Sequence, residues 1–307
     1  MDRFSDLSQL QRQSVALTIG TFDGVHRGHQ QLMQSVKERA VRHGWRSAVL
    51  TFEPHPRAVL RPEQPLVLLC TPVDKAALIA RQGVDMLITL PFTPELARLT
   101  TYEFAASIQA RLEVKELWEG PDFTMGSDMV GVEQIALVGE RLGFALHQID
   151  HYRLAGREVR STAIRNAIIE GDLPAAATML GRYHSIQSEV VHGAQRGRTF
   201  GYPTANQLPP PYLVLPNNGI YATFAELEDG KLLPAATNVG LRPMFADGSR
   251  NVETYILDFD ADIYGQQLRV HFVERLRGEE KFSSLDELIA QMGRDCAQAR
   301  AILAAAR

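Results

Sequence analysis

The sequence predicts two domains: an α/β domain with a parallel sheet, followed by a small antiparallel β-barrel domain with a C-terminal helix. Up to about residue 150, short apolar strands alternate with helical segments, as is typical of a doubly wound parallel sheet. Beyond residue 184, short strands and turn residues follow one another without helices between them, as in a small barrel. The 307 residues also suffice for about two domains of ~150 residues each.

The first half contains the apolar runs and polar loops that such a sheet requires. Strands are expected at residues 17–19, 47–52, 86–90 and 115–118. A helix is expected over residues 30–40, where Leu32, Met33 and Val36 recur at helical spacing. Ligands of an open parallel sheet bind outside the carboxyl ends of the strands. Polar loops follow three of these strands, at residues 20–29, 53–57 and 120–123.

The second half begins with two short helices and continues as strands. One helix is expected to open near residue 161, and another to start after Asp172 and to end at Gly181. We therefore predict one domain over residues 1–183 and a second over residues 184–307. The strands expected in the second domain are 189–191, 221–224, 254–257 and 268–272. The C-terminal helix, residues 284–305, is expected to pack on the barrel through Leu285, Leu288, Ile289 and Met292.

Composition argues against a nucleic-acid-binding protein, a membrane protein and a disulfide- or zinc-stabilised protein. The formal net charge of −4 provides no basic field for duplex nucleic acid, so no nucleic-acid partner is expected. No run of 18 apolar residues and no apolar signal segment occurs, so we expect no membrane association and a cytoplasmic protein. Cys70 and Cys296 are too far apart in sequence to indicate a disulfide framework or a zinc knuckle. The oligomeric state cannot be predicted.

The loop from Gly20 to His29 is the most informative stretch of the chain. It lies between a strand and a helix, and the unpaired N–H groups at a helix N-terminus attract anions. Gly24 and Gly28 allow sharp bends and close approach of a ligand, while His26 and His29 supply donors. The loop fits neither the P-loop nor the dinucleotide fingerprint, which leaves another phosphate loop, half of a metal site, or exposed polar residues.

The His26-Arg27-Gly28-His29 run resembles the H-x-G-H signature of the nucleotidylyltransferase superfamily. Members of this superfamily attack the α-phosphate of ATP and release pyrophosphate. Further along, Ser161 or Thr162 is expected to cap a helix, and Arg165 would place a guanidinium beside the same N-terminus. This arrangement predicts a second anion site.

The barrel half has candidate chemistry of its own. In an extended segment, the Thr204 hydroxyl and the Asn206 carbonyl would point the same way and could hold Mg²⁺ together with phosphate oxygens; the alternative is a simple turn. Glu253, on a predicted strand, could accept a hydroxyl proton or could be solvated surface. Residues 258–262 imitate a calcium loop, but Ile263 and Arg269 replace the glycine and the glutamate that it needs, so calcium binding is disfavoured.

Taken together, motifs across nearly the whole chain resemble those of the bacterial bifunctional riboflavin kinase/FAD synthetase family. The segments that carry the resemblance include 20–29, 51–56, 120–123, 161–165, 180–182, 201–206, 238–243, 253–259, 264–265, 276–277 and 281–282. The chain departs from the family pattern at Met125, Val130, Arg160, Ser188 and Met244.

The resemblance implies a Rossmann-like nucleotidylyltransferase domain, which is an FMN adenylyltransferase, and a Greek-key barrel domain, which is a riboflavin kinase. Substrates would be ATP, riboflavin and FMN, with Mg²⁺ as cofactor on Thr204 and Asn206 and with Glu253 as general base. His26, His29 and Arg165 would be catalytic in the adenylyltransferase. The implied ATP- and phosphate-binding residues are Gly20, Phe22, Asp23, Gly24, Gly28, Ser161, Thr162, Gly193, Arg196, Gly197, Arg198 and Gly201. The implied flavin-binding residues are Asp122, Asn238 and Arg277.

Three other functions compete with this one. The first is an adenylyltransferase that acts on another phosphate and has an inactive barrel. The second is a riboflavin kinase whose N-terminal half is inactive. The third is a regulator that binds flavin or nucleotide without turnover.

Overall fold

The computed structural model describes residues 1–193, 197, 200–241 and 250–306. The chain divides into two compact units. The amino-terminal unit comprises Met1–Leu66 and Thr71–Arg160, and the carboxy-terminal unit comprises Val67–Cys70 and Ser161–Arg307. In this division the two short helices that follow residue 160 group with the barrel. The domain boundary at residue 183 stays a prediction.

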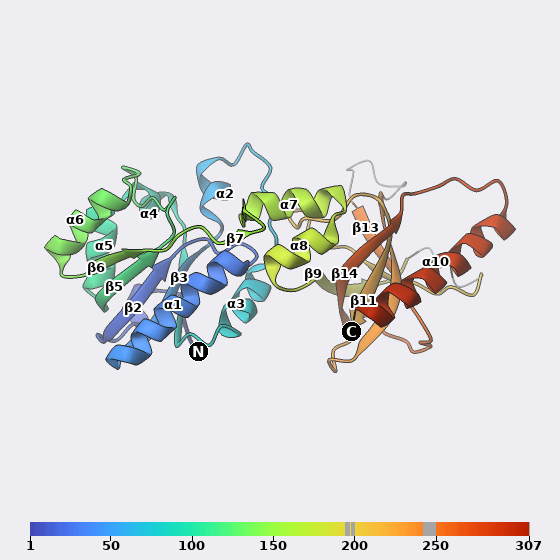
Figure 1. The fold of residues 1–307 in the computed structure, drawn as a ribbon, viewed down its shortest axis with the longest axis horizontal. Coiled ribbons are helices and arrows are strands. Elements are labelled where there is room, and N and C mark those ends of the chain that lie inside the picture. Colours follow the sequence, from blue (N-terminus) through green and yellow to red (C-terminus); the bar gives the residue numbers. More distant parts are fainter. Residues whose placement is uncertain (194–196, 198–199, 242–249, 307) are drawn as a thin grey trace. The chain divides into compact units, whose positions relative to one another are not determined.

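The amino-terminal unit contains a parallel sheet, as predicted (Figure 1). Its order among the described residues is β1-β4-β3-β2-β5-β6, and all of its pairings are parallel. The strands are β1 (Asp2–Phe4), β2 (Ser14–Ile19), β3 (Arg46–Glu53), β4 (Met86–Pro91), β5 (Glu113–Glu119) and β6 (Ala145–Gln148). The connections contain η1 (Leu7–Gln9), α1 (Arg27–His43), α2 (Pro56–Leu60), α3 (Pro72–Ala80), α4 (Pro94–Arg98), α5 (Thr101–Gln109) and α6 (Val132–Leu142), and a hairpin of β7 (Arg153–Leu154) and β8 (Arg157–Glu158) ends the unit.

Both faces of this sheet are covered, because side chains alternate along each strand. In β3, Leu50 packs in the core that also contains Phe104 of α5 and Ile135 of α6. The intervening Val49 packs in a second core with Met33 of α1 and Ile79 of α3. Strand order reverses between β2 and β5, so the loops after these two strands flank the switch point where ligands of such sheets bind.

The carboxy-terminal unit contains a closed antiparallel barrel (Figure 1). In the described part of the chain its order is β10-β13-β12-β11-β14-β9, with β9 also paired to β10. Strands β11, β12 and β13 are sequential neighbours, and β14 returns to pair with β11, which is the predicted Greek-key arrangement. The strands are β9 (His184–Val191), β10 (Ala205–Gln207), β11 (Gly219–Glu226), β12 (Leu232–Leu241), β13 (Arg250–Ile256) and β14 (Gln267–Arg277).

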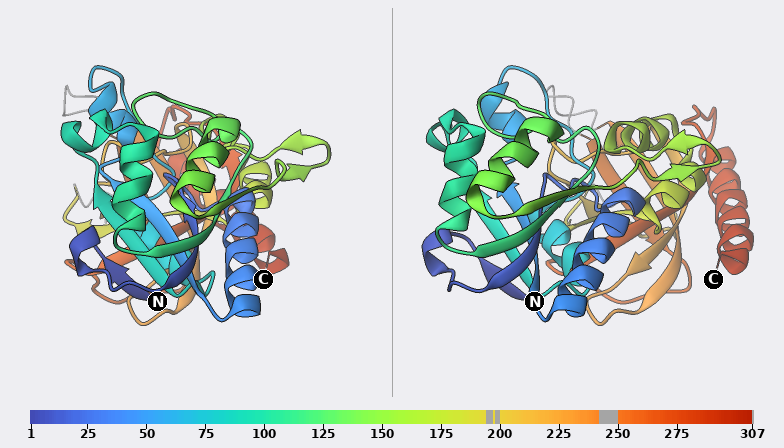
Figure 2. Two further views of the ribbon diagram at one scale, coloured as in Figure 1. Left: turned by 90° about the vertical axis from the view of Figure 1, so that its left-hand side faces the viewer. Right: turned by 60° about the vertical axis from the view of Figure 1, so that its left-hand side comes forward.

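The predicted C-terminal helix, α10 (Leu285–Ala305), lies along the outside of the barrel (red in Figure 2). Of the four residues expected to face the barrel, Leu288, Ile289 and Met292 are half-buried. Ala299 and Leu303 pack with Phe224 and Val273 of the barrel, whereas Leu285 is exposed. The expected apolar stripe lies in the first turns of the helix, whereas the barrel contacts the later turns.

Two short helices precede the barrel: α7 (Ser161–Glu170) and α8 (Leu173–Leu180). As predicted, the Asp172 side chain accepts a hydrogen bond from a backbone N–H in the first turn of α8, and Gly181 ends the helix in the left-handed conformation, with φ of 75°. The barrel unit also includes a distant piece of chain. The N–H of Leu68 donates to the carbonyl of Tyr212, and the N–H of Val214 donates to the carbonyl of Leu68.

Candidate active sites

The loop of residues 20–29 connects β2 to α1 and is held in a strained conformation. His26 is the N-cap of α1, and its Nδ1 accepts the N–H of His29 at 3.4 Å. Gly24 has φ of 76°, and two non-glycine residues also adopt positive φ, Phe22 at 49° and Val25 at 41°. Such a conformation is costly for a β-branched residue and clusters at functional sites. The loop therefore has the strain expected of a preorganised binding element.

Close packing fixes the two histidines. Their rings stack with centroids 3.6 Å apart, and the Phe22 ring meets His29 edge-on at 5.2 Å. A Cβ at Gly28 would lie 3.2 Å from the His26 ring, and one at Gly20 would lie 3.0 Å from the Phe22 ring. Gly28 was expected to bend the chain, but it lies inside α1, so its role here is to admit the His26 ring.

His29 is suited to donate a hydrogen bond as a neutral group. Burial and the neighbouring His26 lower the pKa of His29 well below its ordinary value. The Nδ1 of His29 is buried and has no hydrogen-bond partner among the described residues. A neutral imidazole keeps one N–H to donate and does not add a mobile charge.

A buried lysine beneath the loop was not predicted. Lys75 of α3 is 8% exposed. Its Nζ donates to the carbonyls of Thr21, at 3.4 Å, and Phe52, at 3.1 Å, and lies 3.7 Å from the Glu53 carboxylate. The chain thus places a fixed positive charge against the start of the phosphate loop. Nothing in the local sequence distinguishes Lys75 from a surface lysine.

A buried carboxyl group at the end of β5 was also not predicted. Glu119 is 2% exposed, and its Oε1 accepts the N–H of Ile19 at 2.7 Å. Burial raises the pKa of Glu119 well above its ordinary value, whereas the hydrogen bond from Ile19 lowers it to a smaller extent. Ile19 directly precedes Gly20, so this hydrogen bond fixes the point where the loop leaves β2.

The loop after β5 contains the predicted flavin-binding residue Asp122, which is exposed. Its Oδ2 lies 2.8 Å from Nη2 of Arg160 and 3.6 Å from Nε2 of His151. Two of the residues that depart from the family pattern lie in the same loop. Met125 and Val130 form a backbone bridge, and both pack against the sheet core.

Ser161, Thr162 and Arg165 lie together in the first turns of α7. The helix begins at Ser161, so Ser161 and Thr162 lie in its first turn. Nη1 of Arg165 lies 3.5 Å from the Thr162 hydroxyl. These three residues belong to the carboxy-terminal unit, whereas His26 and His29 belong to the amino-terminal unit.

Three candidate residues of the barrel lie in one row across neighbouring strands. In the strand register, Asn206 of β10 is opposite Glu253 of β13, and Glu253 is opposite Asn238 of β12. All three side chains are half-buried, whereas their neighbours Val252 and Thr254 are buried in the barrel interior. Residues directly opposite one another share a face, so the row lies on the outer face of the barrel.

The predicted magnesium ligands are adjacent, and glycines surround them. Nδ2 of Asn206 lies 3.5 Å from the Thr204 hydroxyl and donates to the Thr204 carbonyl at 3.0 Å. A Cβ at Gly193 would lie 2.5 Å from Cγ of Asn206, and one at Gly197 would lie 2.3 Å from the Tyr202 carbonyl oxygen. Neutral oxygens beside glycines, which have no side chain to fill the space, fit a hard cation such as Mg²⁺.

The remaining phosphate-loop residues are placed only in part. Gly201 has φ of 82°, which requires glycine there. Arg196 and Arg198 lie outside the described residues. Of the residues that depart from the family pattern, Met244 also lies outside them. Ser188 lies in β9 and accepts hydrogen bonds from the Gln207 amide.

A cavity of about 350 Å³ opens beside the predicted magnesium ligands. Thr204 and Asn206 line it together with residues 259–264, and Phe259 and Tyr264 contribute aromatic surface. The segment that imitated a calcium loop therefore forms a wall of the cavity. Asp258 itself is directed elsewhere, because its carboxylate pairs with Arg300 at 2.7 Å.

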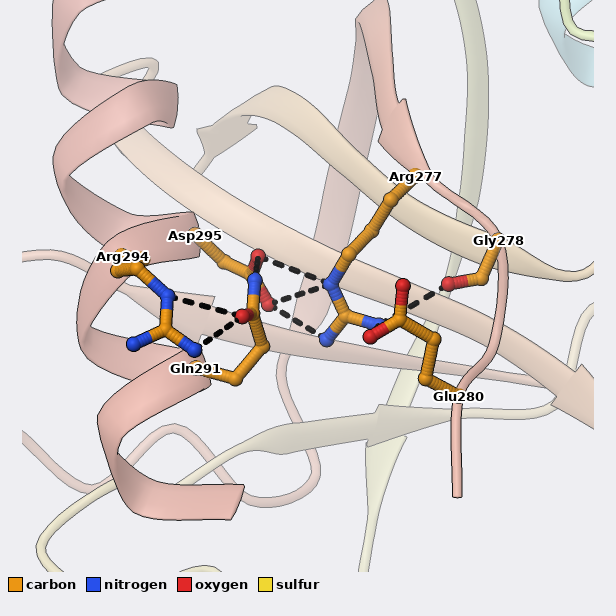
Figure 3. A network of polar contacts seen from close by, with 6 residues as sticks. All are labelled: Arg277, Gly278, Glu280, Gln291, Arg294 and Asp295. Atoms are coloured by element: carbon orange, nitrogen blue, oxygen red, sulfur yellow. Dashed lines mark hydrogen bonds and ion pairs between the residues drawn. The ribbon is translucent and has the colours of Figure 1, made fainter. Parts of the chain in front are cut away.

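The other predicted flavin-binding residues differ in their surroundings. Oδ1 of Asn238 is buried and has no hydrogen-bond partner in the described part of the chain. Arg277 is engaged by α10: Figure 3 shows its guanidinium forming a bidentate pair with the buried Asp295, at 2.7 Å for the closest contact. Arg277 also donates to the Gly278 carbonyl. In this structure Arg277 therefore connects β14 to α10.

Two family models and several relatives match the chain. The FAD synthetase model matches residues 8–163, and the riboflavin kinase model matches residues 180–303. The bifunctional riboflavin kinase/FMN adenylyltransferase of Pseudomonas fluorescens is 38% identical over 94% of this chain and 92% of its own length. The chain belongs to the bifunctional riboflavin kinase/FMN adenylyltransferase family. The relative in Escherichia coli (strain K12) is 35% identical over 96% of this chain and 95% of its own length.

A solved structure shares the fold over nearly the whole chain. It is described as a macrolide-efflux protein from Streptococcus pneumoniae, with 30% identity and a TM-score of 0.89, and the match covers 97% of this chain and 98% of that one. Within the described residues of this family member, no helix is both long and apolar enough to cross a membrane.

Proposed function

We propose that the chain synthesises flavin cofactors in two steps: the carboxy-terminal unit phosphorylates riboflavin to FMN, and the FMN is then adenylylated to FAD at a site that includes the loop of residues 20–29. One observation supports this above all. Each of the two matched family ranges contains its own set of candidate residues, one around the loop of residues 20–29 and one around the row of Asn206, Glu253 and Asn238.

For the kinase reaction, the row on the barrel provides the reacting groups. We assign Glu253 as the base that takes the proton of the riboflavin 5′-hydroxyl while its oxygen attacks the γ-phosphorus of ATP. The bond between that phosphorus and the bridging oxygen breaks, and ADP leaves. The Asn251 amide donates to Glu253 at 2.7 Å and holds the carboxylate in orientation.

The nucleotide is proposed to occupy the cavity beside the predicted magnesium ligands. Phe259 and Tyr264 provide surface for the adenine ring, and Thr204 and Asn206 provide oxygens at the phosphate end. Mg²⁺, when bound, would neutralise charge on the phosphates. Phosphoryl transfer depends chiefly on such positioning and charge neutralisation, so Thr204, Asn206 and the glycines around them should matter at least as much as Glu253.

For the adenylyl reaction, an oxygen of the FMN phosphate attacks the α-phosphorus of ATP, and pyrophosphate leaves with the bridging oxygen. The nucleophile is already anionic at neutral pH, so no strong base is required. We assign His26 and His29 as neutral donors to the ATP phosphates, with the Lys75 charge beneath them. That Ser161, Thr162 and Arg165 hold the leaving pyrophosphate stays a prediction from the family resemblance.

One experiment tests the proposal and its alternatives. Purified protein is incubated with riboflavin, ATP and Mg²⁺, and the flavins are separated by chromatography. Accumulation of FMN and then FAD is expected. FMN alone would indicate a kinase with an inactive amino-terminal half, FAD from added FMN alone would indicate an inactive barrel, and unchanged riboflavin would leave a binding protein. Because both steps consume ATP, we propose that the protein acts in the cytoplasm.

A further inference from the structure

We infer that Arg160 and His151 form the docking site for the phosphate of incoming FMN, and that Asp122 occupies this site while FMN is absent. The inference rests on the proposed adenylyl transfer and assigns that reaction a specificity-determining residue, Arg160, which none of the roles above includes. It follows from the contacts at the base of the hairpin formed by β7 and β8 (yellow-green in Figure 2).

The hairpin base lies against the phosphate loop. The N–H of Val159 donates to the carbonyl of Tyr152 at 2.9 Å, which continues the pairing of the two arms and brings His151 and Arg160 together. Nη2 of Arg160 and Nε2 of His151 are 3.3 Å apart. A Cβ at Gly28 would lie only 3.5 Å from Cβ of Tyr152, so this base borders the first turn of α1.

Arg160 and His151 also lie close to the loop after β5, which contains Asp122. Arg160 reaches across to Asp122, with 2.8 Å between nitrogen and oxygen, and also pairs with Glu158 of its own hairpin at the same distance. The Arg160 guanidinium therefore holds one exposed carboxylate, with the His151 ring beside it, between the loops that follow β2 and β5 and hence beside the switch point of the sheet.

The chemistry of this arrangement fits a phosphate monoester. A carboxylate oxygen held by a guanidinium stands where a phosphate oxygen would bind, because both are anionic acceptors and a guanidinium matches either. Asp122 is exposed and supplied from a separate loop, so it can be displaced without loss of core packing.

The phosphate is that of FMN rather than of ATP. The ATP phosphates are assigned to the α1 N-terminus with His26 and His29, and the attacking oxygen must approach the α-phosphorus from the side opposite to the leaving pyrophosphate. A second polyanion beside the first requires cations of its own. The Arg160 guanidinium lies at the flank of the loop and provides such a charge.

The test measures the KM for FMN and the KM for ATP separately, in FAD formation by the full chain. Arg160→Gln is expected to raise the KM for FMN about tenfold, the value of one charge-assisted hydrogen bond, and to leave the KM for ATP unchanged. Arg160→Lys, which keeps the charge but not the planar fork, should recover part of the affinity. Arg153→Gln is the matched control, because Arg153 is an exposed arginine that pairs with the same Glu158 at 3.0 Å but not with Asp122.

The outcomes separate the inference from the proposed function. If the wild-type protein makes no FAD, the proposed adenylyl transfer itself is refuted. Normal FAD formation together with an unchanged KM for FMN in Arg160→Gln would overturn only the docking site. An equal rise in both KM values, or the same rise in Arg153→Gln, would also overturn it, since either would indicate general disturbance of the loops. Riboflavin phosphorylation by each variant reports that the chain remains folded.

Discussion

Replacing Gly193 with alanine should strongly slow riboflavin phosphorylation while leaving the rest of the molecule intact. The added Cβ would lie 2.5 Å from Cγ of Asn206 and 2.6 Å from its Oδ1. Ordinary contact begins at 3.4 Å, so the amide must move by about 0.9 Å, the difference between 3.4 and 2.5 Å. A displacement of about 1 Å at a positioning group costs roughly 10²-fold in rate. We therefore expect kcat for FMN formation to fall about 100-fold and the Mg²⁺ concentration for half-maximal rate to rise.

The assay follows FMN formation from riboflavin at several Mg²⁺ concentrations, with FAD formation from added FMN as an internal control. Gly293→Ala is the matched variant, because its Cβ would meet the Tyr202 hydroxyl at an ordinary 3.5 Å and alanine suits the interior of α10. A Gly193→Ala protein with wild-type rate and wild-type Mg²⁺ dependence would refute the assignment of Asn206 to the metal. An equal loss in Gly293→Ala would show that the barrel tolerates no added methyl group.

Three further predictions concern single side chains. Glu253→Gln should lower the rate of FMN formation ~10²–10⁴-fold, the usual effect of losing a general base, and an unchanged rate would remove Glu253 from the mechanism. His29→Ala should reduce FAD formation at least ~10²-fold and spare FMN formation; loss of both activities would contradict separate sites. Glu119→Gln should stabilise the protein at pH 8 but not at pH 4, as measured by thermal unfolding, because burial raises the pKa of Glu119 in the fold while the unfolded chain ionises at the ordinary value. The stability of the wild type then falls as pH rises above that ordinary value, by about 1.4 kcal/mol for each unit by which the pKa in the fold exceeds it. Identical pH profiles for the two proteins would count against a raised pKa of Glu119.

The sequence was sufficient to predict the fold because each element has a local signature. Alternating apolar runs indicated the parallel sheet, and the glycine-rich turn before an apolar helical stripe indicated the start of α1. The Thr204 hydroxyl and the Asn206 amide nitrogen lie 3.5 Å apart, because residues two apart in an extended segment point the same way. Their role as metal ligands stays a prediction. These features depend on neighbours within about ten residues.

Features set by distant parts of the chain could not be predicted in this way. Lys75 and Glu119 are charged residue types that are usually solvated, and only packing around the ends of β2, β3 and β5 buries them. The helical period predicted α10 correctly, but it did not show that Ala299 and Leu303 are the side chains buried against the barrel and that Leu285 is exposed. The opposition of Asn238 to Glu253 likewise depends on the pairing register of β12 with β13, which sequence spacing does not determine.

Residues 67–70 have a practical consequence for separating the two activities. A fragment beginning at Ser161 would retain every strand of the barrel but would lose the backbone partner of Tyr212 and Val214, since both bond to Leu68. Buried backbone groups without partners are costly, so such a fragment would leave the Tyr212 carbonyl and the Val214 N–H without the hydrogen bonds that they form in the full chain. Dissection of this enzyme is better done by point substitution in the intact polypeptide, or by supplying residues 67–70 as a separate peptide.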